Sequence, residues 1–369
     1  MAPVNKNSGF HRSFVFNVMG LIVCVLFSLQ FLDAQTSHRL SDLREVVPAN
    51  WTLYAPALQK WENHLLLADT YNNRIVILDR NLRVERQIGQ IGQDPGNLFQ
   101  PFDLTIDSKG NIYILDNQGR RVQVFDWDGK LISQFTSPLT ISNIAVNSAG
   151  EIFVSRPYSG YVVDVLDLHG TLLRSFGDTR KISDFYGDEL RESNNRLGFA
   201  VNRCKLAFDA QENIYVAFEV APVLQKYDKS GHLIFTKYIA GGEAEMIRST
   251  FRTQHKSPIV HAYPGDKVST PYILSGMAID RQTGRIWVSL LWDRCWLYIL
   301  NLEGDTVEVH DMPRKDLLLQ KLVYDQRQHV LLSAVLSSRN TSAIYEVDSP
   351  ELGAKSSHPT TYPQETKSK

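Results

Sequence analysis

The sequence is poor in residues that carry redox or nucleophilic chemistry. It contains three cysteines, Cys24, Cys204 and Cys295, and no Cys-x-x-Cys pair. It also lacks a glycine-rich phosphate loop and a Ser-His-Asp arrangement, so nothing in it supports nucleotide, redox or serine-nucleophile chemistry. A chain of 369 residues has no need of a covalent staple. We therefore expect Cys204 and Cys295 to be buried free thiols and not a disulfide.

The chain also lacks an excess of charge of either sign. Its 39 lysines and arginines are balanced by 40 aspartates and glutamates, which gives a formal net charge of -1. Proteins that bind nucleic acid or other polyanions through bulk charge are strongly basic. The composition therefore predicts no nucleic-acid partner and leaves open only a local cationic patch.

A long apolar run occurs near the N-terminus. Residues 14–32 are mostly apolar and follow Lys6 and Arg12, a pattern typical of an export signal. Residues 1–34 are therefore predicted to be a signal peptide that is cleaved before Gln35, with an uncleaved membrane anchor as the alternative. In both cases the remainder of the chain is expected outside the cytoplasm, as a periplasmic, secreted or membrane-anchored protein.

Residues 96–135 have the pattern of four short strands separated by turns. The turn clusters contain aspartate and glycine, and the apolar runs between them are too short for helices. The predicted strands are 102–106, 112–115, 122–125 and 131–135. A sheet of four such strands cannot bury both of its faces alone, so the pattern predicts further copies.

The copies are present along the chain. Large apolar residues fall at equivalent places in six segments: Leu66, Tyr113, Phe153, Tyr215, Trp287 and Leu331. Where no insertion intervenes, the repeat length is about 40 to 47 residues, which is typical of a propeller blade. We therefore predict an all-β fold, a six-bladed β-propeller made of four-stranded antiparallel blades.

The first repeats resemble the NHL-repeat family of propellers. The resemblance is carried by the Asp-x-x-Gly-Asn-Ile-Tyr segment at 107–113 and by the aspartate and arginine that follow it, Asp116 and Arg121. Asp69 and Arg74 hold the same places in the first repeat, and we expect each arginine to brace its turn by pairing with the aspartate. The later repeats keep only the apolar skeleton. The resemblance thus implies a propeller fold for the whole ring, whereas the specific sequence motifs of the family occur only in about its first half.

The last repeat is one strand short. Only three strands are predicted after residue 316, at 317–324, 330–335 and 343–347. Propellers avoid an open sheet edge by pairing the two ends of the chain, so we predict that residues 43–47 form the outer strand of the sixth blade. The propeller then occupies residues 35–348, and the Pro-, Ser-, Thr- and Lys-rich residues 349–369 are predicted to be disordered.

Two insertions, residues 178–202 and 239–270, interrupt the blade rhythm. Connections of this length in a compact domain usually serve as lids or binding loops. Each joins an outer strand to the next inner strand, so both leave the ring on the same face. We expect them to lie over the mouth of the central channel and predict that a ligand binds there.

Cationic and aromatic residues are predicted on this same face. The candidate ligand-binding residues are Arg120, Arg156, Tyr158, Arg203, Lys205, Trp292 and Arg294. A guanidinium group binds a carboxylate or phosphate through two parallel N–H groups, and a neighbouring aromatic ring adds a flat apolar surface. The pattern predicts a small anionic ligand or an acidic protein or peptide partner.

Some propellers of this type are metal-dependent lyases or hydrolases, which supplies an alternative function. Calcium would need oxygen ligands near the channel, and the candidates are Asp103, Asn143, Glu219 and Asp293. The histidines avoid the predicted inner strands and match no zinc spacing. We therefore predict a monomeric binding module without a resident cofactor, and keep a lactonase-like or amidating-lyase-like enzyme with calcium or zinc as the alternative.

Overall fold

The computed structural model describes most of the chain from residue 57 onward. The described residues are 38–39, 44–47, 57–116, 120–157, 159–181, 184–185, 201–254, 260–261, 270–291, 294–312, 317–325, 329–336 and 341–348. All of them belong to the second of two compact units, Met1–Thr36 and Ser37–Lys369. The predicted export segment at 1–34 and the predicted disordered tail at 349–369 lie outside the described residues. Among those described, no helix has the length and apolar composition that a membrane span requires.

Four sheets of four antiparallel strands come first in the chain, and we number them in chain order. Sheet 1 contains β3 (Leu58–Trp61), β4 (His64–Asp69), β5 (Arg74–Leu78) and β6 (Val84–Ile88). Sheet 2 contains β7 (Asp103–Ile106), β8 (Ile112–Asp116), β9 (Arg121–Phe125) and β10 (Leu131–Thr136). Sheet 3 contains β11 (Asn143–Val146), β12 (Ile152–Ser155), β13 (Tyr161–Leu166) and β14 (Leu172–Asp178). Sheet 4 contains β15 (Cys204–Phe208), β16 (Ile214–Phe218), β17 (Val223–Tyr227) and β18 (Leu233–Tyr238).

Two further large sheets incorporate strands from the N-terminal side of the chain. Sheet 5 contains β21 (Leu274–Asp280), β22 (Arg285–Leu291), β23 (Cys295–Leu300) and β24 (Thr306–Asp311), and β1 (His38–Arg39) adds to β24 in parallel. Sheet 6 contains β25 (Leu317–Asp325), β26 (His329–Leu336), β27 (Thr341–Asp348) and, at its outer edge, β2 (Arg44–Val47). Arg44 lies opposite Glu346 in an antiparallel register. The prediction that residues 43–47 supply the missing outer strand is confirmed.

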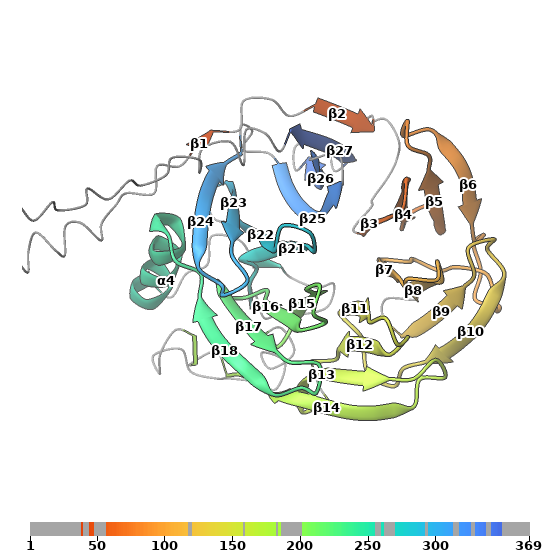
Figure 1. Ribbon diagram of the computed structural model, residues 1–369, viewed down its shortest axis with the longest axis horizontal. Helices are drawn as coiled ribbons and strands as arrows, with labels where there is room; N and C mark the ends of the chain where they lie inside the picture. The colour runs from red at the N-terminus through yellow and green to blue at the C-terminus, as the bar shows by residue number, and fades with distance from the viewer. Residues whose placement is uncertain are drawn as a thin grey trace, which may run out of the picture. The chain divides into compact units, whose positions relative to one another are not determined.

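The six sheets stand around a common axis (Figure 1). Their first strands contact one another in the order β3, β7, β11, β15, β21, β25, and β25 returns to β3. The fold is thus an all-β propeller with four-stranded antiparallel blades. Because neighbouring strands run in opposite directions, the first-to-second turns of every sheet lie on one face of the ring, which we call the turn face. The second-to-third turns and the connections between sheets lie on the other, the linker face.

An aspartate builds the turn between the first two strands in sheets 2, 4 and 5. In sheet 2, one carboxylate oxygen of Asp107 accepts the N–H groups of Lys109 and Asn111 at 2.9 Å, and the other accepts Asn111 Nδ2 at 2.8 Å. Gly110 completes the turn with a φ of +86°, and a Cβ there would lie 2.8 Å from Trp61 of sheet 1. The glycine therefore meets both the turn conformation and the close approach of the neighbouring sheet.

Large residues of the second strands fill the space between neighbouring sheets. Tyr215 of β16 is fully buried, and its hydroxyl donates to the carbonyl oxygen of Leu302 in sheet 5 at 2.8 Å. Tyr113, Phe153 and Trp287 hold the equivalent positions and are buried as well. These are the residues that made the repeat visible in the sequence, so the periodicity reflects packing between sheets.

The helical part of the second insertion does not cover the channel mouth. In α4 (Gly242–Gln254), the N–H of Ala244 donates to the Tyr298 hydroxyl at 3.2 Å, and that hydroxyl donates to Glu243 Oε2 at 2.9 Å. The Arg248 guanidinium lies 4.2 Å from the centre of the Tyr238 ring. Figure 1 accordingly shows α4 outside β18 and β24, at the outer rim of sheets 4 and 5. The expectation that this insertion overhangs the channel is wrong for the helix, because the helix buries its apolar face against Tyr298. The short strands β19 (Val260–His261) and β20 (Thr270–Pro271) pair with each other.

The described part of the first insertion packs on the linker face over sheet 4. The Asn202 side chain accepts the N–H of Arg180 at 2.7 Å and donates to its carbonyl oxygen at 3.0 Å, which closes the base of the insertion. Phe185 is buried, with its ring 5.1 Å from that of Phe218 at the end of β16. Residues 182–183 and 186–200 lie outside the described residues.

Both cysteines of the propeller are free and buried, as predicted. Burial raises the pKa of the Cys204 thiol well above its ordinary value. The thiolate is the reactive form, so a buried thiol of this kind is chemically inert at neutral pH.

Candidate functional site

The cationic residues predicted to bind a ligand are at the linker face, but most of them have partners within the protein. Tyr158 and Trp292 lie outside the described residues. Arg120 is exposed in the turn before β9. The other four, Arg156, Arg203, Lys205 and Arg294, each contact a carboxylate. Their role in ligand binding stays a prediction, and their contacts give each of them a structural role.

The two arginines of the first two repeats, Arg74 and Arg121, brace their turns, as expected. Arg74 Nε lies 2.8 Å from Asp69 Oδ2, and Arg121 NH2 lies 2.6 Å from Asp116 Oδ2. Both aspartates are fully buried. Arg121 also donates to the carbonyl oxygen of Asn97 at 3.1 Å, which ties the connection between sheets 1 and 2 to β9.

Arg156 and Arg294 make similar contacts in sheets 3 and 5. Arg156 Nε lies 2.7 Å from Oδ2 of the buried Asp164. Arg294 NH1 lies 3.2 Å from Asp311 Oδ2, and the guanidinium group is 5.7 Å from the centre of the Trp296 ring. Each arginine thus bridges strands of its own sheet, and the two are not brought together into one site.

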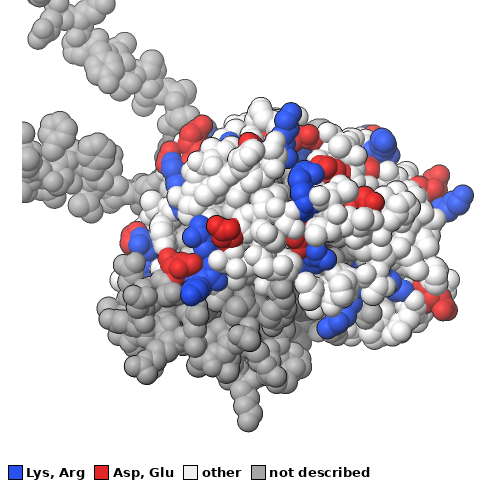
Figure 2. Space-filling model, turned by 90° about the horizontal axis from the view of Figure 1, so that it is seen from below, with Lys and Arg blue, Asp and Glu red and all other residues white. Residues whose placement is uncertain are grey.

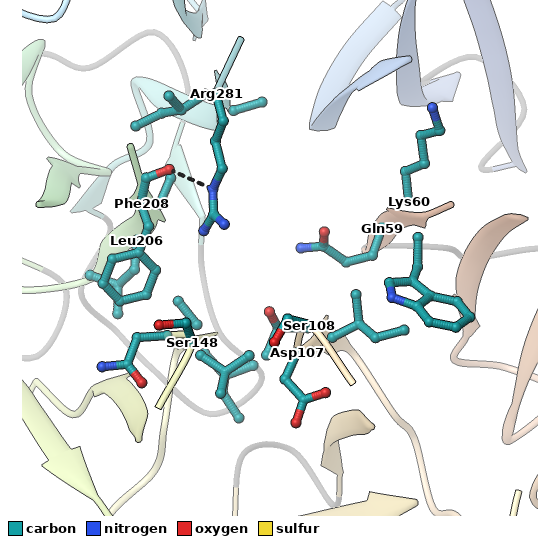
Figure 3. Close-up of a pocket in the computed structure, with 18 of the residues that line it drawn as sticks. Gln59, Lys60, Asp107, Ser108, Ser148, Leu206, Phe208 and Arg281 are labelled. Carbon is teal, nitrogen blue, oxygen red and sulfur yellow. Dashed lines mark hydrogen bonds between the residues drawn. The ribbon is translucent and has the colours of Figure 1, made fainter. Parts of the chain in front are cut away.

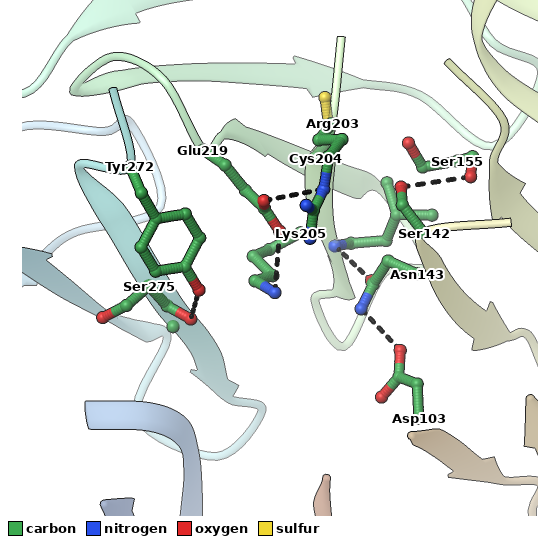
Figure 4. A network of polar contacts seen from close by, with 12 residues as sticks. Asp103, Ser142, Asn143, Ser155, Arg203, Cys204, Lys205, Glu219, Tyr272 and Ser275 are labelled. Atoms are coloured by element: carbon green, nitrogen blue, oxygen red, sulfur yellow. Dashed lines mark hydrogen bonds and ion pairs between the residues drawn. The ribbon is translucent and has the colours of Figure 1, made fainter. Parts of the chain in front are cut away.

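Glu219, directly after β16, holds two cations that flank the start of β15 (Figure 4). Its Oε2 lies 3.0 Å from Arg203 Nε and its Oε1 lies 2.9 Å from Lys205 Nζ. Its carbonyl oxygen accepts the N–H groups of Ile273 and Leu274, which ties sheet 4 to sheet 5. Burial is the largest single influence on the pKa of Lys205 and lowers it, but the charge of Glu219, its hydrogen bond to Lys205 and the nearby Tyr272 together outweigh burial, and the net shift is upward. Lys205 is therefore protonated at neutral pH, and the cluster carries two positive charges against one negative charge.

Asp103 and Asn143, the candidate calcium ligands, join three first strands to one another (Figure 4). Asn143 Nδ2 donates to Asp103 Oδ2 at 2.6 Å, and Asn143 Oδ1 accepts the N–H of Leu206 at 2.8 Å. The N–H of Ile144 also donates to Asp103 Oδ2, at 3.2 Å. Asp293 lies outside the described residues. Within the part of the chain that is described, no three His, Cys, Asp or Glu side chains are arranged to hold a metal ion.

The surface charges are mixed, as the composition predicts. On the side shown in Figure 2, the Lys and Arg of the described residues are interspersed with Asp and Glu. Lys237 Nζ lies 2.5 Å from Asp305 Oδ1, and Arg174 NH1 lies 2.6 Å from Glu151 Oε1. Opposite charges this close cancel one another at longer range, so this side of the described structure carries no extended field of one sign.

A cavity of about 420 Å³ opens at the other end of the channel, on the turn face (Figure 3). It is lined by the last residues of the first strands of sheets 1 to 5 and by the turns that follow them. Cavities of roughly 300–1,000 Å³ hold small-molecule ligands. This candidate site lies opposite the face that the sequence pointed to.

In sheets 2 to 5, the first strand carries a small residue two places before the turn Asp or Asn, and these small side chains leave room for the cavity. Directly opposite each of them, the second strand carries a large aromatic residue. The pairs are Thr105 and Tyr113, Ala145 and Phe153, Ala207 and Tyr215, and Ala278 and Trp287. Paired residues face the same side of a sheet, so the aromatic residue fills the wide gap between sheets and a small residue fits the narrow gap near the axis. The sequence carries this signal as a small residue two places before each turn Asp or Asn.

Polar groups enter the cavity from two opposite sides (Figure 3). Gln59 holds the position of the small residues in sheet 1, and its amide points into the cavity. Arg281 comes from the turn after β21; its Nε donates to the carbonyl oxygen of Phe208 at 3.3 Å, and its terminal nitrogens face the cavity. The exposed residues Ser108 and Ser148 stand in the turns at the mouth.

The aspartates at the cavity are engaged in their own turns. Asp107 accepts the hydrogen bonds described above, and Asp280 accepts the N–H of Gln282 at 2.9 Å and the hydroxyl of Thr283. Glu62 is exposed at the rim. The cavity therefore offers a ligand the guanidinium group of Arg281 and the amide of Gln59, with hydroxyl groups at its mouth and Lys60, Asn147 and Gln282 among its other polar lining residues.

Comparison with known sequences indicates the same architecture. A family model described as a 6-bladed beta-propeller matches residues 54–160, which span sheets 1 and 2 and part of sheet 3. The protein brain tumor of Drosophila melanogaster is 25% identical over 125 residues, which is 32% of this chain and 12% of that protein. The alignment thus covers only a small part of this relative's length.

Solved structures share the fold at low sequence identity. A putative exported protein of Bacteroides fragilis superimposes with a TM-score of 0.55 at 11% identity, over 85% of this chain and 97% of that chain. A gluconolactonase of Xanthomonas campestris superimposes with a TM-score of 0.52 at 14% identity, over 84% of this chain and 91% of that chain. Identities this low show the propeller fold alone.

Proposed function

We propose that this protein is a six-bladed, NHL-like propeller that acts as a binding module and holds its ligand in the channel cavity on the turn face. Counting the five-stranded sheet as a blade gives six sheets around the axis, in line with the family description. The observation that carries the proposal is the cavity of about 420 Å³ with Arg281 and Gln59 directed into it. A concave site with a few convergent polar groups is the usual form of a small-molecule site.

A ligand screen with a blocked cavity tests this proposal. The chain from residue 35 onward is screened by thermal shift against sugars, lactones, carboxylic acids, short peptides and divalent metals. Ser108→Trp fills the mouth from an exposed turn, and Ser230→Trp makes the same change in an exposed turn away from the cavity. We expect ligands whose stabilising effect disappears in Ser108→Trp and persists in Ser230→Trp. A flat response to the whole panel, or binding that Ser108→Trp leaves intact, would refute the proposal.

The linker face supports a second candidate site in the same protein. The support is that two cations, Arg203 and Lys205, both contact the carboxylate of Glu219 beside the start of β15. An anion binding there would be lost in Lys205→Met and retained in Ser108→Trp, so the same screen separates the two faces. A metal-dependent hydrolase or lyase would instead give stabilisation by calcium or zinc and turnover of a lactone or amide substrate.

We also propose that the propeller lies outside the cytoplasm. The support is the basic and apolar pattern of residues 1–34, which is typical of an export signal. Mass spectrometry of the mature protein checks this proposal. A mature chain that begins at Gln35 supports cleavage, and a full-length chain in the membrane fraction supports the anchor. A full-length chain in the cytosol would contradict both.

A further inference from the structure

We infer that the ligand of the channel cavity carries a carboxylate group and that Arg281 binds it. This inference deepens the proposed function and depends on it. It names the chemical class of the ligand and a residue that the sequence pattern did not single out.

The position of Arg281 leaves its terminal nitrogens available to a ligand. The hydrogen bond from Nε to the carbonyl oxygen of Phe208 holds the side chain against the end of β15. With Nε held there, NH1 and NH2 face the cavity (Figure 3). Two N–H groups in one plane match the two oxygens of a carboxylate, and an arginine already held in place loses less side-chain entropy on binding.

The charge around Arg281 differs from that around the arginines that brace their own sheets. Arg121, Arg156 and Arg294 lie within 3.2 Å of a carboxylate oxygen of the protein. Among the described residues, no carboxylate oxygen lies within 4.0 Å of Arg281. Glu212 is a nearby acid whose Oε1 accepts the N–H of Ser148 at 2.7 Å; this hydrogen bond is the main cause that lowers its pKa, and the charge of Arg281 lowers it further. Arg281 thus lines this mouth with a guanidinium group that no carboxylate of the described residues contacts directly.

The remaining wall indicates what else the ligand carries. The Gln59 amide faces Arg281 across the cavity, and Ser108 stands at the mouth (Figure 3). Leu206 and Phe208 supply apolar wall on the side of β15. A matching ligand has a carboxylate at one end and neutral hydrogen-bonding groups at the other. Sugar acids and the C-terminal end of a short peptide both have this form.

Matched pairs of acids and amides test the inference by isothermal titration calorimetry. The probes are glucuronate with glucuronamide, and Gly-Gly-Gly with its C-terminal amide, so the two sources of a carboxylate are separate arms. We expect at least one acid to bind at least tenfold more tightly than its amide. Arg281→Ala removes this preference, and Arg281→Lys retains only part of it. Arg83→Ala, which changes an exposed arginine in the turn between β5 and β6 that does not line the cavity, leaves it unchanged. Equal affinity for acid and amide in both pairs, or a preference that survives in Arg281→Ala, overturns the inference.

The outcomes also separate this inference from the proposed function. One outcome is that neutral compounds bind, lose this binding in Ser108→Trp and keep it in Arg281→Ala. Such a result would support the cavity as the binding site and refute the inference that its ligand carries a carboxylate. If every probe still bound to Ser108→Trp, the proposal that the cavity is the binding site would be refuted. Displacement of a bound acid by equimolar inorganic phosphate would overturn the assignment to a carboxylate. Arg281 is exposed, so its variants are expected to keep the parent Tm, and the same samples report that value.

Discussion

Ala207 and Tyr215 lie directly opposite each other on the first two strands of sheet 4. Tyr215 is fully buried against sheet 5, whereas Ala207 lines the channel cavity. The same pairing of a small and a large residue recurs in sheets 2, 3 and 5. Neighbouring sheets converge toward the axis, so the gap between them is wide at the second strands and narrow at the first strands. This difference in width explains both the packing of large residues between sheets and the cavity at the axis.

Truncation of Tyr215 tests the packing half of this relationship. Tyr215→Ala leaves a void between sheets 4 and 5 and is expected to reduce the free energy of unfolding by about 3–5 kcal/mol. Tyr215→Phe keeps the ring and removes the hydroxyl that donates to the carbonyl oxygen of Leu302 and, at 3.4 Å, to Asp209 Oδ2, so its expected cost is about 1 kcal/mol. Urea denaturation of the two variants measures both values. Equal costs would show that the hydroxyl, and not the ring, carries the stabilisation.

Asn143 is expected to be important for stability because its side chain joins three sheets. Asn143→Ala leaves Asp103 Oδ2 and the N–H of Leu206 without this partner in a buried place, at an expected cost of about 2–3 kcal/mol. Asn63→Ala, an exposed turn residue, is the control and is expected to change stability by less than about 0.5 kcal/mol. Equal effects of the two substitutions would contradict a linking role for Asn143.

Glu219 offers a test of the buried ion cluster. Glu219→Gln leaves Arg203 and Lys205 without their carboxylate in a buried setting, and the expected loss is about 3–5 kcal/mol. Asp305→Asn removes the carboxylate of an exposed ion pair with Lys237 and should cost less than about 1 kcal/mol. Adding Lys205→Met to Glu219→Gln removes one of the unpaired charges. The double variant is therefore expected to be more stable than Glu219→Gln alone, and a further loss would contradict the account.

The fold was readable from the sequence because its determinants are local. Asp107 and Gly110 specify a turn within five residues, and the large residues such as Tyr113 and Tyr215 mark the second strands by their repeat. The outer strand of sheet 6 was predicted from a strand count and from the rule that sheets avoid open edges. Neither step needs knowledge of contacts between distant side chains.

The candidate site was less readable because it depends on contacts between distant residues. Arg156 and Arg203 looked available in the sequence, but Asp164 and Glu219 reach them across the sheet only once the strands are in register. The position of α4 also depends on a distant residue, Tyr298 of β23. The cavity itself arises where side chains are small, and an alanine in a strand carries little signal by itself. The repeated small residue before the turn could have identified it.

The aspartates of the third-to-fourth turns predict how stability depends on pH. In sheets 3 and 4, hydrogen bonds from the N–H groups of Thr171 and His232 lower the pKa of Asp167 and Asp228. A carboxylate whose pKa is lower in the folded state stabilises the fold above its ordinary pKa of about 4 and loses this contribution as the pH falls. Urea midpoints should therefore decline below about pH 4. In Asp167→Asn, which accepts the same hydrogen bonds without titrating, the decline between pH 5 and pH 3 should be smaller, and an unchanged decline would contradict this assignment.

Stepwise shortening of the N-terminal side tests the closure of the ring. A chain that begins at residue 35 retains β1 and β2, and one that begins at residue 40 retains only β2. A chain that begins at residue 48 lacks both strands. β1 adds two residues to the four strands already present in sheet 5, whereas β2 is the fourth strand of sheet 6 and covers the outer edge of β27. We expect a small change in Tm on removal of β1 and a fall of several degrees on removal of β2. The chain lacking β2 should also associate at high concentration, because an uncovered strand edge pairs with other chains. The matched control ends at residue 348 and keeps β27 intact. It is expected to keep the Tm of the chain that begins at residue 35, and a larger loss from this end than from removal of β2 would show that the ring is closed by other contacts.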